Sequence, residues 1–260
     1  MDKLKSPMFA EERQMQILTV LHRDKKILVH DLCELLSVSP VTIRTDLTDL
    51  EGKGLLSRTH GGAILCGKMT FEENAEQKEV KNMPLKLRIA EEAVKFVEDG
   101  DSIAIDTGTT TSAFTSCLTE KHGLTVVTSD LKVALFLEEN TDATVIIVGG
   151  TVRRGYHCTV GTVAEQTVGR FNVDKCFLGT NGLTARRGLS TPNAGQAAVK
   201  QLMIDRSNQL FVLCDREKIG RDSLATVAPA SAIHVLITNE GADQEELAAI
   251  EQCNVDIHCV

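Results

Sequence analysis

The chain has 260 residues, of which 42% are hydrophobic and 25% are charged, a composition typical of a soluble globular protein with one or two domains. It contains no run of about 18 apolar residues, and charges recur throughout the N-terminal segment, so neither a membrane span nor a secretory signal is expected. The eight cysteines are scattered, without a Cys-x-x-Cys pair or a His/Cys cluster at metal-ligand spacing. We therefore expect a cytoplasmic protein with reduced thiols, no metal and no cofactor.

The net charge of −8 is unevenly distributed along the chain. Residues 1–70 carry a net charge of +1, whereas residues 71–260 carry −9. An acidic body argues against a protein that binds polyanions over its whole surface. The nearly neutral N-terminal segment leaves room for a small module that contacts nucleic acid with one face.

Residues 1–65 have the pattern of three short helices followed by a β-hairpin. The third helix is well marked, because Ser39 is a suitable N-cap, Pro40 follows at the first helical position, and apolar residues then recur at helical spacing. Two short strands flank a glycine turn at Gly61. The apolar stripes of the three helices are Met15, Ile17, Leu18 and Leu21; Leu32, Leu35 and Leu36; and Ile43, Leu47 and Leu50. This pattern predicts a winged helix-turn-helix domain, whose third helix can enter a major groove.

The side chains on the polar face of the third helix suit contacts with DNA. Hydroxyl and guanidinium groups bind phosphates and base edges, whereas Asp46, Asp49 and Glu51 would repel phosphate and restrict close contact to the first turns of the helix. Taken alone, Arg44 has the ordinary interpretation of a solvated surface charge. Its place in a complete module favours a DNA contact. The predicted DNA-binding residues are Ser39, Thr42, Arg44, Thr45, Thr48, Arg58, His60 and Gly61.

Residues 66–83 are poor in apolar side chains and are predicted to be a linker, and residues 84–260 form a larger body. Pro84 opens a helix, after which strands and helices alternate. The expected strands are 102–106, 124–128, 144–148, 175–179, 209–214, 233–238 and 255–259. Most are continuous apolar runs, which indicates strands covered on both faces. We therefore predict a mostly parallel α/β domain.

Polar and glycine-rich loops follow several of these strands. In open α/β sheets a ligand lies beyond the carboxyl ends of the strands, and Asp106-Thr-Gly-Thr-Thr-Thr111 offers free N–H groups, hydroxyls and a glycine to a phosphate. A strand-to-helix turn capped by threonines, with solvated lysines nearby, is the simpler alternative. A phosphorylated sugar fits the ligand-binding interpretation. The predicted effector-binding residues are Asp106, Gly108, Thr109, Thr110, Thr111, Thr128, Gly149, Gly150, Asn181, Lys200 and Lys218.

Both parts of the chain carry short motifs of a known family: Ser39-x2-Thr42-Ile43-Arg44-x-Asp46-Leu47, Arg58-x-His60-Gly61-Gly62, Asp106-x-Gly108-Thr109-Thr110, Gly149-Gly150, Gly179-x2-Gly182, Val199-Lys200 and Asp215-x2-Lys218-x-Gly220. With these motifs the chain resembles the DeoR family of bacterial sugar-responsive repressors. The resemblance implies a body with the fold of phosphosugar isomerases, a sugar phosphate as inducer and a homo-oligomer, dimer or tetramer. Thr45 departs from the basic residue usual beside Arg44, and Asn193, Gly195 and Gln196 stand where acidic residues are common.

Two enzymatic alternatives remain. A sugar-phosphate isomerase needs a positioned general base, and Asp106 is the best candidate because the later loops carry amides and hydroxyls instead of carboxylates. A sugar kinase is disfavoured. The Asp-x-Gly-Thr-Thr motif resembles the phosphate loop of actin-like kinases, but those chains are far longer and begin with this loop, whereas here it starts at Asp106. The favoured hypothesis is a regulator that binds double-stranded operator DNA as an oligomer, because one helix-turn-helix reads one half-site.

Overall fold

The computed structural model describes residues 9–24, 26–52, 55–59, 61–65, 69, 72 and 75–260, and divides the chain into two compact units, Met1–Phe71 and Glu72–Val260. The boundary differs from the expected one. Part of the predicted linker is a helix, α4 (Ala75–Val80), that belongs to the C-terminal unit. His60, a predicted DNA-binding residue, lies outside the described residues.

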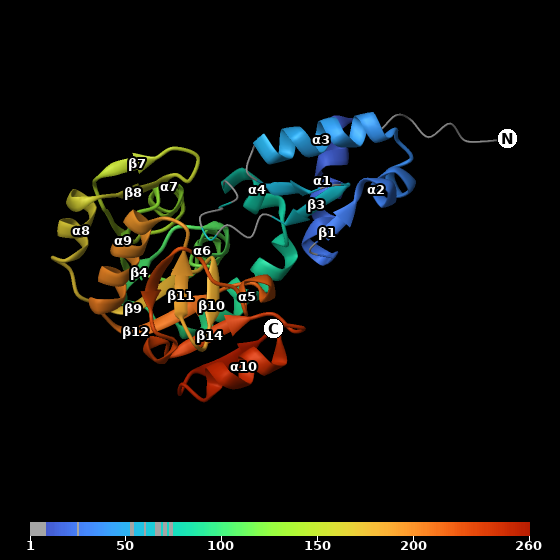
Figure 1. Cartoon of the computed structure of the whole chain (residues 1–260). Helices are drawn as coiled ribbons and strands as arrows, with labels where there is room; N and C mark the ends of the chain where they lie inside the picture. Colours follow the sequence, from blue (N-terminus) through green and yellow to red (C-terminus); the bar gives the residue numbers. More distant parts are fainter. Residues whose placement is uncertain are drawn as a thin grey trace. The chain divides into compact units, whose positions relative to one another are not determined.

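The N-terminal unit has the expected three helices and hairpin. Its elements are α1 (Ala10–Asp24), β1 (Lys26–Leu28), α2 (Val29–Leu36), α3 (Pro40–Gly52), β2 (Leu56–Thr59) and β3 (Gly62–Leu65) (Figure 1). Ile43, Leu47 and Leu50 of α3 are buried as predicted. The sequence did not indicate β1, which has only three residues and pairs with β3 in an antiparallel sheet of order β1-β3-β2. A side chain at Gly62 would collide with the backbone of Ile27, so this pairing requires glycine there.

The C-terminal unit is built on a seven-stranded parallel sheet of order β15-β14-β12-β9-β4-β5-β6. All seven expected strands are present, with shifts of a few residues at their ends. They are β4 (Ser102–Ile105), β5 (Thr125–Thr128), β6 (Thr144–Ile147), β9 (Val173–Gly179), β12 (Ser207–Leu213), β14 (Val235–Thr238) and β15 (Asp256–Cys259). The chain starts in the middle of the sheet, runs to one edge and then returns to build the other half. The order therefore reverses between β4 and β9, the position at which open α/β sheets bind ligands.

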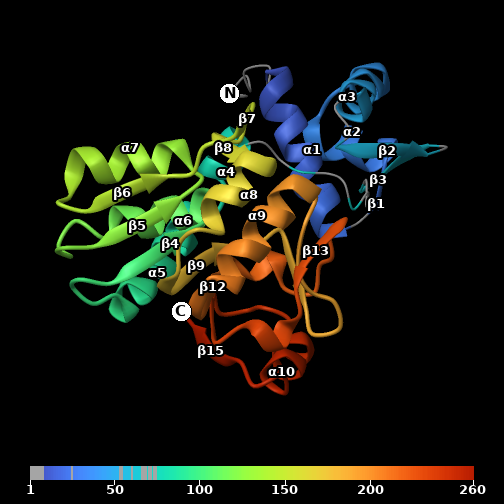
Figure 2. The same cartoon turned by 90° about the vertical axis from the view of Figure 1, so that its left-hand side faces the viewer.

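Helices cover both faces of the sheet, which explains the continuous apolar strands. One face packs against α5 (Met83–Ala93), α6 (Thr109–Ser116) and α7 (Leu131–Asn140), with a stack of Phe114, Phe177 and Phe211 at its centre. The other packs against α8 (Thr162–Val168), α9 (Ala194–Asp205) and α10 (Gln244–Glu251); Figure 2 shows α8 and α9 in front of the sheet.

Smaller elements complete this unit. They are the hairpin β7 (Thr151–Arg153) and β8 (Cys158–Val160), the antiparallel sheet β10 (Gly182–Thr184), β11 (Gly188–Thr191) and β13 (Ala225–Ala228), and the 3-10 turns η1 (Val94–Phe96), η2 (Arg216–Lys218) and η3 (Ala230–Ala232). Among the described residues, no helix combines the length and the hydrophobicity that a membrane span requires.

Candidate functional site

The N-terminal unit presents the polar face of α3 to solvent. Ser39 caps the helix, since its hydroxyl oxygen accepts the N–H of Thr42 at 3.2 Å. Arg44, Thr45 and Thr48 are exposed, while Ile43 and Leu47 lie in the core on the opposite side. The α3 surface therefore offers a guanidinium and several hydroxyls, groups that bind phosphates and base edges.

The hairpin is tied to the same helix through Arg58 on β2. Its guanidinium donates to the hydroxyl of Thr48 at 2.8 Å, and its backbone N–H donates to the Glu51 carboxylate at 2.8 Å. Gly61, at the turn, is exposed and has a φ of 92°, a conformation that favours glycine. Glu51 is thus engaged by the hairpin.

The structure corrects the expected role of Asp46. Its side chain is only 3% exposed, and its carboxylate accepts the Arg13 guanidinium of α1, with one N–H···O distance of 3.0 Å. The pair neutralises the charge inside the domain, so Asp46 is not a surface carboxylate that repels phosphate. Sequence reasoning missed this because it depends on α1 crossing α3 at a position that spacing along one helix does not reveal.

The C-terminal unit contains a cavity of about 370 Å³ at the carboxyl ends of its central strands. Its wall includes the loop and first turn of α6 after β4 and the Gly179–Asn181 loop after β9, the two sides of the switch point. The first N–H groups of a helix have no partner within it. Gly108, with a φ of 143°, precedes the first turn of α6 and has no Cβ to obstruct these donors.

Seven predicted effector-binding residues line this cavity, and four do not. Those in the wall are Gly108, Thr109, Thr110, Thr111, Asn181, Lys200 and Lys218. Thr128 is fully buried, and its hydroxyl oxygen accepts the Asp130 N–H at 3.1 Å. Gly149 and Gly150 follow the edge strand β6, away from the switch point; a Cβ at Gly150 would lie 2.8 Å from the Val160 carbonyl oxygen, so close packing explains that glycine.

Asp106 is the fourth residue outside the wall, and it forms a buried ion pair with Lys200. The two side chains are 2% and 4% exposed. The Asp106 carboxylate also accepts the Gly179 N–H at 3.0 Å, and Lys200 donates to the Gly179 carbonyl at 2.8 Å. Burial raises the pKa of Asp106, and Lys200 offsets part of that effect. These contacts link β4, β9 and α9. Because Asp106 is buried, paired with Lys200 and outside the cavity wall, it is unsuited to be the general base of an isomerase.

Sequence reasoning missed the contribution of residues 72–86 to the cavity. Glu72, Lys78, Lys81 and Lys86 all lie in its wall, and Lys132 joins them from α7. Lys86 is 3% exposed, and its ammonium donates to the carbonyl of Lys78. The low apolar content of residues 66–83 indicated a linker, because the contacts that hold Lys78 and Lys81 are ion pairs with Glu72 and Glu217, which leave no hydrophobic stripe in the sequence.

Two acidic groups in the wall of the cavity or beside it are held by ion-pair or hydrogen-bond partners. Glu217 pairs with Lys81 at 2.8 Å; burial alone would raise its pKa, but the hydrogen bond and charge of Lys81 lower it to about 2. Asp130 accepts the Thr107 hydroxyl at 2.6 Å and caps α7. Among the described residues no His/Cys/Asp/Glu group is arranged to hold a metal ion.

An exposed helix-turn-helix joined to a separate ligand cavity defines a ligand-responsive transcription regulator, and comparison with known proteins agrees. Residues 13–69 match the DeoR-like helix-turn-helix domain, and residues 81–240 match the DeoR C-terminal sensor domain. The chain belongs to the DeoR family of HTH-type transcriptional regulators. It is therefore a regulator, as expected, and the enzymatic alternatives are not supported.

The relatives are similar over nearly their whole length. The chain is 34% identical to the HTH-type transcriptional regulator GlpR of Haloferax volcanii, covering 96% of this chain and 98% of the relative. It is 31% identical to the putative aga operon transcriptional repressor of Escherichia coli O157:H7, covering 95% and 92%. Among solved structures, ribose 5-phosphate isomerase A of Methanocaldococcus jannaschii is 21% identical over 53% of this chain and 55% of that one, with a TM-score of 0.40.

Proposed function

We propose that this protein represses a sugar-metabolism operon, that α3 reads the operator, and that a phosphorylated sugar in the C-terminal cavity changes DNA affinity. The observation that carries the proposal is the cavity itself, where a helix N-terminus, a row of hydroxyls and several lysines meet at the switch point. The aga relative, named as a putative operon repressor, supports the same direction of control.

On the DNA side, Arg44 is the proposed base- or phosphate-contacting residue. An operator is first selected from random duplexes with the full-length protein, and binding is then followed by fluorescence anisotropy at fixed salt. Arg44→Ala should weaken operator binding about 5-fold to 150-fold, the range for loss of one good bidentate contact. Arg23→Ala is the matched control, since this exposed arginine pairs with Asp24 on α1, outside the proposed interface. Equal effects of both substitutions would contradict the assignment.

On the effector side, the cavity favours an anion that also carries hydroxyls. The hydroxyls of Thr109 and Thr110 and the ammonium of Lys218 supply the matching groups. A thermal-shift screen compares sugar monophosphates with their unphosphorylated parents, because a ligand that binds the native state raises its melting temperature. A parent sugar that stabilises the protein as well as its phosphate ester does would refute a phosphosugar effector.

The proposed operator-binding form is a homo-oligomer assembled through the C-terminal unit. One helix-turn-helix reads one half-site, so specificity requires a second copy. The edge strand β6 and neighbouring α7 expose Ile147 and Leu135, which are 44% and 58% exposed. Leu135→Glu should lower the sedimentation-derived mass and the operator affinity together. An unchanged mass would exclude this edge as the contact.

A further inference from the structure

Glu72 occupies a position where the ligand cavity meets the chain that leads to the DNA-binding domain. The N-terminal unit ends at Phe71, so Glu72 follows it directly in sequence and is the first residue of the C-terminal unit. Its side chain is nevertheless only 6% exposed, and it lines the cavity. A charged residue at a domain junction is usually solvated, so its burial requires specific partners.

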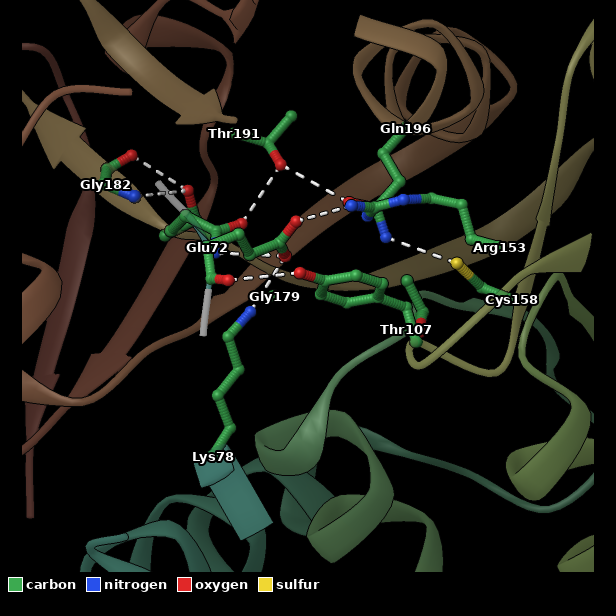
Figure 3. Close-up of polar contacts among 12 residues, drawn as sticks. Glu72, Lys78, Thr107, Arg153, Cys158, Gly179, Gly182, Thr191 and Gln196 are labelled. Carbon is green, nitrogen blue, oxygen red and sulfur yellow. Dashed lines mark hydrogen bonds and ion pairs between the residues drawn. The ribbon is translucent and has the colours of Figure 1, made fainter. Parts of the chain in front are cut away.

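Those partners are basic and amide groups drawn from three separate parts of the unit. The Glu72 carboxylate accepts Lys78 of α4 at 2.8 Å and Arg153 of β7 at 2.8 Å (Figure 3). It also accepts the Asn181 amide at 3.4 Å. The backbone carbonyl of Glu72 also accepts the hydroxyl of Tyr156 at 3.1 Å. The Tyr156 ring stacks on Arg153, with 3.7 Å from the guanidinium carbon to the ring centroid.

The same set of donors would suit an external anion. Lysine, a planar guanidinium and an amide are the groups that bind carboxylates and phosphates in proteins. Burial would raise the pKa of Glu72, but the charges and hydrogen bonds of Lys78 and Arg153 outweigh it and hold the pKa below its usual range. Glu72 is thus anionic at neutral pH, and two of its donors, Lys78 and Asn181, also line the effector cavity.

We propose that the Glu72 carboxylate is an internal competitor of the effector, and that the anionic group of the effector, held at the N-terminus of α6, displaces it from Lys78 and Asn181, which line the same cavity. This inference rests on the proposed function of the cavity. The displaced carboxylate is no longer fixed to α4, β7 and the loop after β9, so the point where the chain enters the C-terminal unit is released. Effector binding thereby changes the restraint on the segment that carries the DNA-binding domain.

Competition of this kind couples the two sites in both directions. If displacement of Glu72 accompanies loss of DNA affinity, the DNA-bound form must hold Glu72 in place and bind the effector less well. Removing the carboxylate charge should therefore tighten anion binding and weaken operator binding together. A carboxylate that only positioned Lys78 and Asn181 for the effector would give the opposite result for the anion.

The test compares the full-length protein with Glu72→Gln, which keeps the size and an acceptor oxygen but removes the charge. Glu79→Gln is the matched control, because Glu79 lies next to Lys78 on α4 and lines the same cavity, but its pair with Lys132 at 3.3 Å is half-exposed. The probe is inorganic phosphate. The chain has one tyrosine and no tryptophan, so intrinsic emission reports on Tyr156, which contacts Glu72.

We expect Glu72→Gln to bind phosphate at least about 5-fold more tightly than the wild type, the lower end of ordinary coupling between sites. Glu79→Gln should gain less than about 2-fold, as expected for an exposed pair. Glu72→Asp, which retains the charge, should stay near the wild type, and melting curves confirm that each variant is folded. In the wild type, phosphate should also make Tyr156 more accessible to acrylamide quenching.

Three results separate the hypotheses. If the wild type binds phosphate and Glu72→Gln binds it no more tightly, the competitor role is overturned while the proposed function stands. If Glu79→Gln or Glu72→Asp gains as much as Glu72→Gln, the competitor role is overturned as well. If none of the proteins binds phosphate or any sugar phosphate, the proposed function fails and the inference fails with it.

Discussion

The buried pair of Asp106 and Lys200 makes a quantitative prediction about stability. Lys200→Met keeps most of the side-chain volume but leaves the Asp106 carboxylate in a site where it is 2% exposed. Removing one partner of a buried pair costs about 3–5 kcal/mol, because the remaining charge is uncompensated. In a domain of this size each kcal/mol lowers Tm by about 2–4 °C, so Tm should fall by about 6–20 °C.

The sign of the pH dependence follows from the carboxyl group. Burial raises the pKa of Asp106, and without Lys200 nothing comparable offsets that effect. The penalty for charging the carboxyl is absent below its ordinary pKa of about 3.9 and grows as the pH rises toward the folded-state pKa. The deficit of Lys200→Met relative to the wild type should therefore shrink as the pH is lowered from about 7 to about 4.5.

Thermal unfolding followed by circular dichroism measures this deficit, with two variants as controls. Adding Asp106→Asn to Lys200→Met removes the orphan charge and should restore at least about 1–2 kcal/mol. Lys175→Met breaks the pair of Lys175 with Asp101, whose side chains are each 13% exposed, and should cost less. If Lys200→Met lowers the free energy of unfolding by less than about 1 kcal/mol, with no pH dependence, the pair does not stabilise the fold as a buried ion pair.

Three further perturbations test other parts of the structure. Gly108→Val introduces a β-branched residue at a φ of 143° before α6. It should abolish the thermal shift caused by a sugar phosphate without changing operator affinity. An unchanged thermal shift would exclude the α6 N-terminus as the anion site. Arg13→Met leaves Asp46 buried without its partner and should lower the free energy of unfolding of the N-terminal domain, measured in urea, by about 1–3 kcal/mol. An unchanged free energy of unfolding would contradict the buried pair. The ion pair of Glu217 with Lys81 contributes stability that is present above about pH 4.5 and is lost as the pH falls toward the Glu217 pKa of about 2. Glu217→Gln should therefore make the free energy of unfolding less dependent on pH in this acidic range. A pH dependence equal to that of the wild type would show that the pair contributes nothing.

The sequence predicted most of what depends on local periodicity. The stripe of Ile43, Leu47 and Leu50 identified α3 because one turn of helix brings such residues to one side, and Ser39 marked where the helix starts. Continuous apolar runs predicted most of the seven strands of the parallel sheet, since strands covered on both faces need no polar side. The loop at Gly108 was identified because a glycine and several hydroxyl residues between a strand and a helix indicate an anion-binding turn, and all of them are neighbours in sequence.

Contacts between residues distant in sequence were decided by the tertiary structure alone. Lys200 reads as a free cation in the sequence, but α9 places it against Asp106, 94 positions away along the chain. Residues 72–83 read as a linker because they have few apolar side chains, yet Arg153 and Asn181 hold Glu72 within the cavity wall. The physical reason is that the burial of apolar side chains appears in the sequence as a periodic pattern within each helix or strand. An ion pair leaves no such pattern, because its partner comes near only when the chain folds.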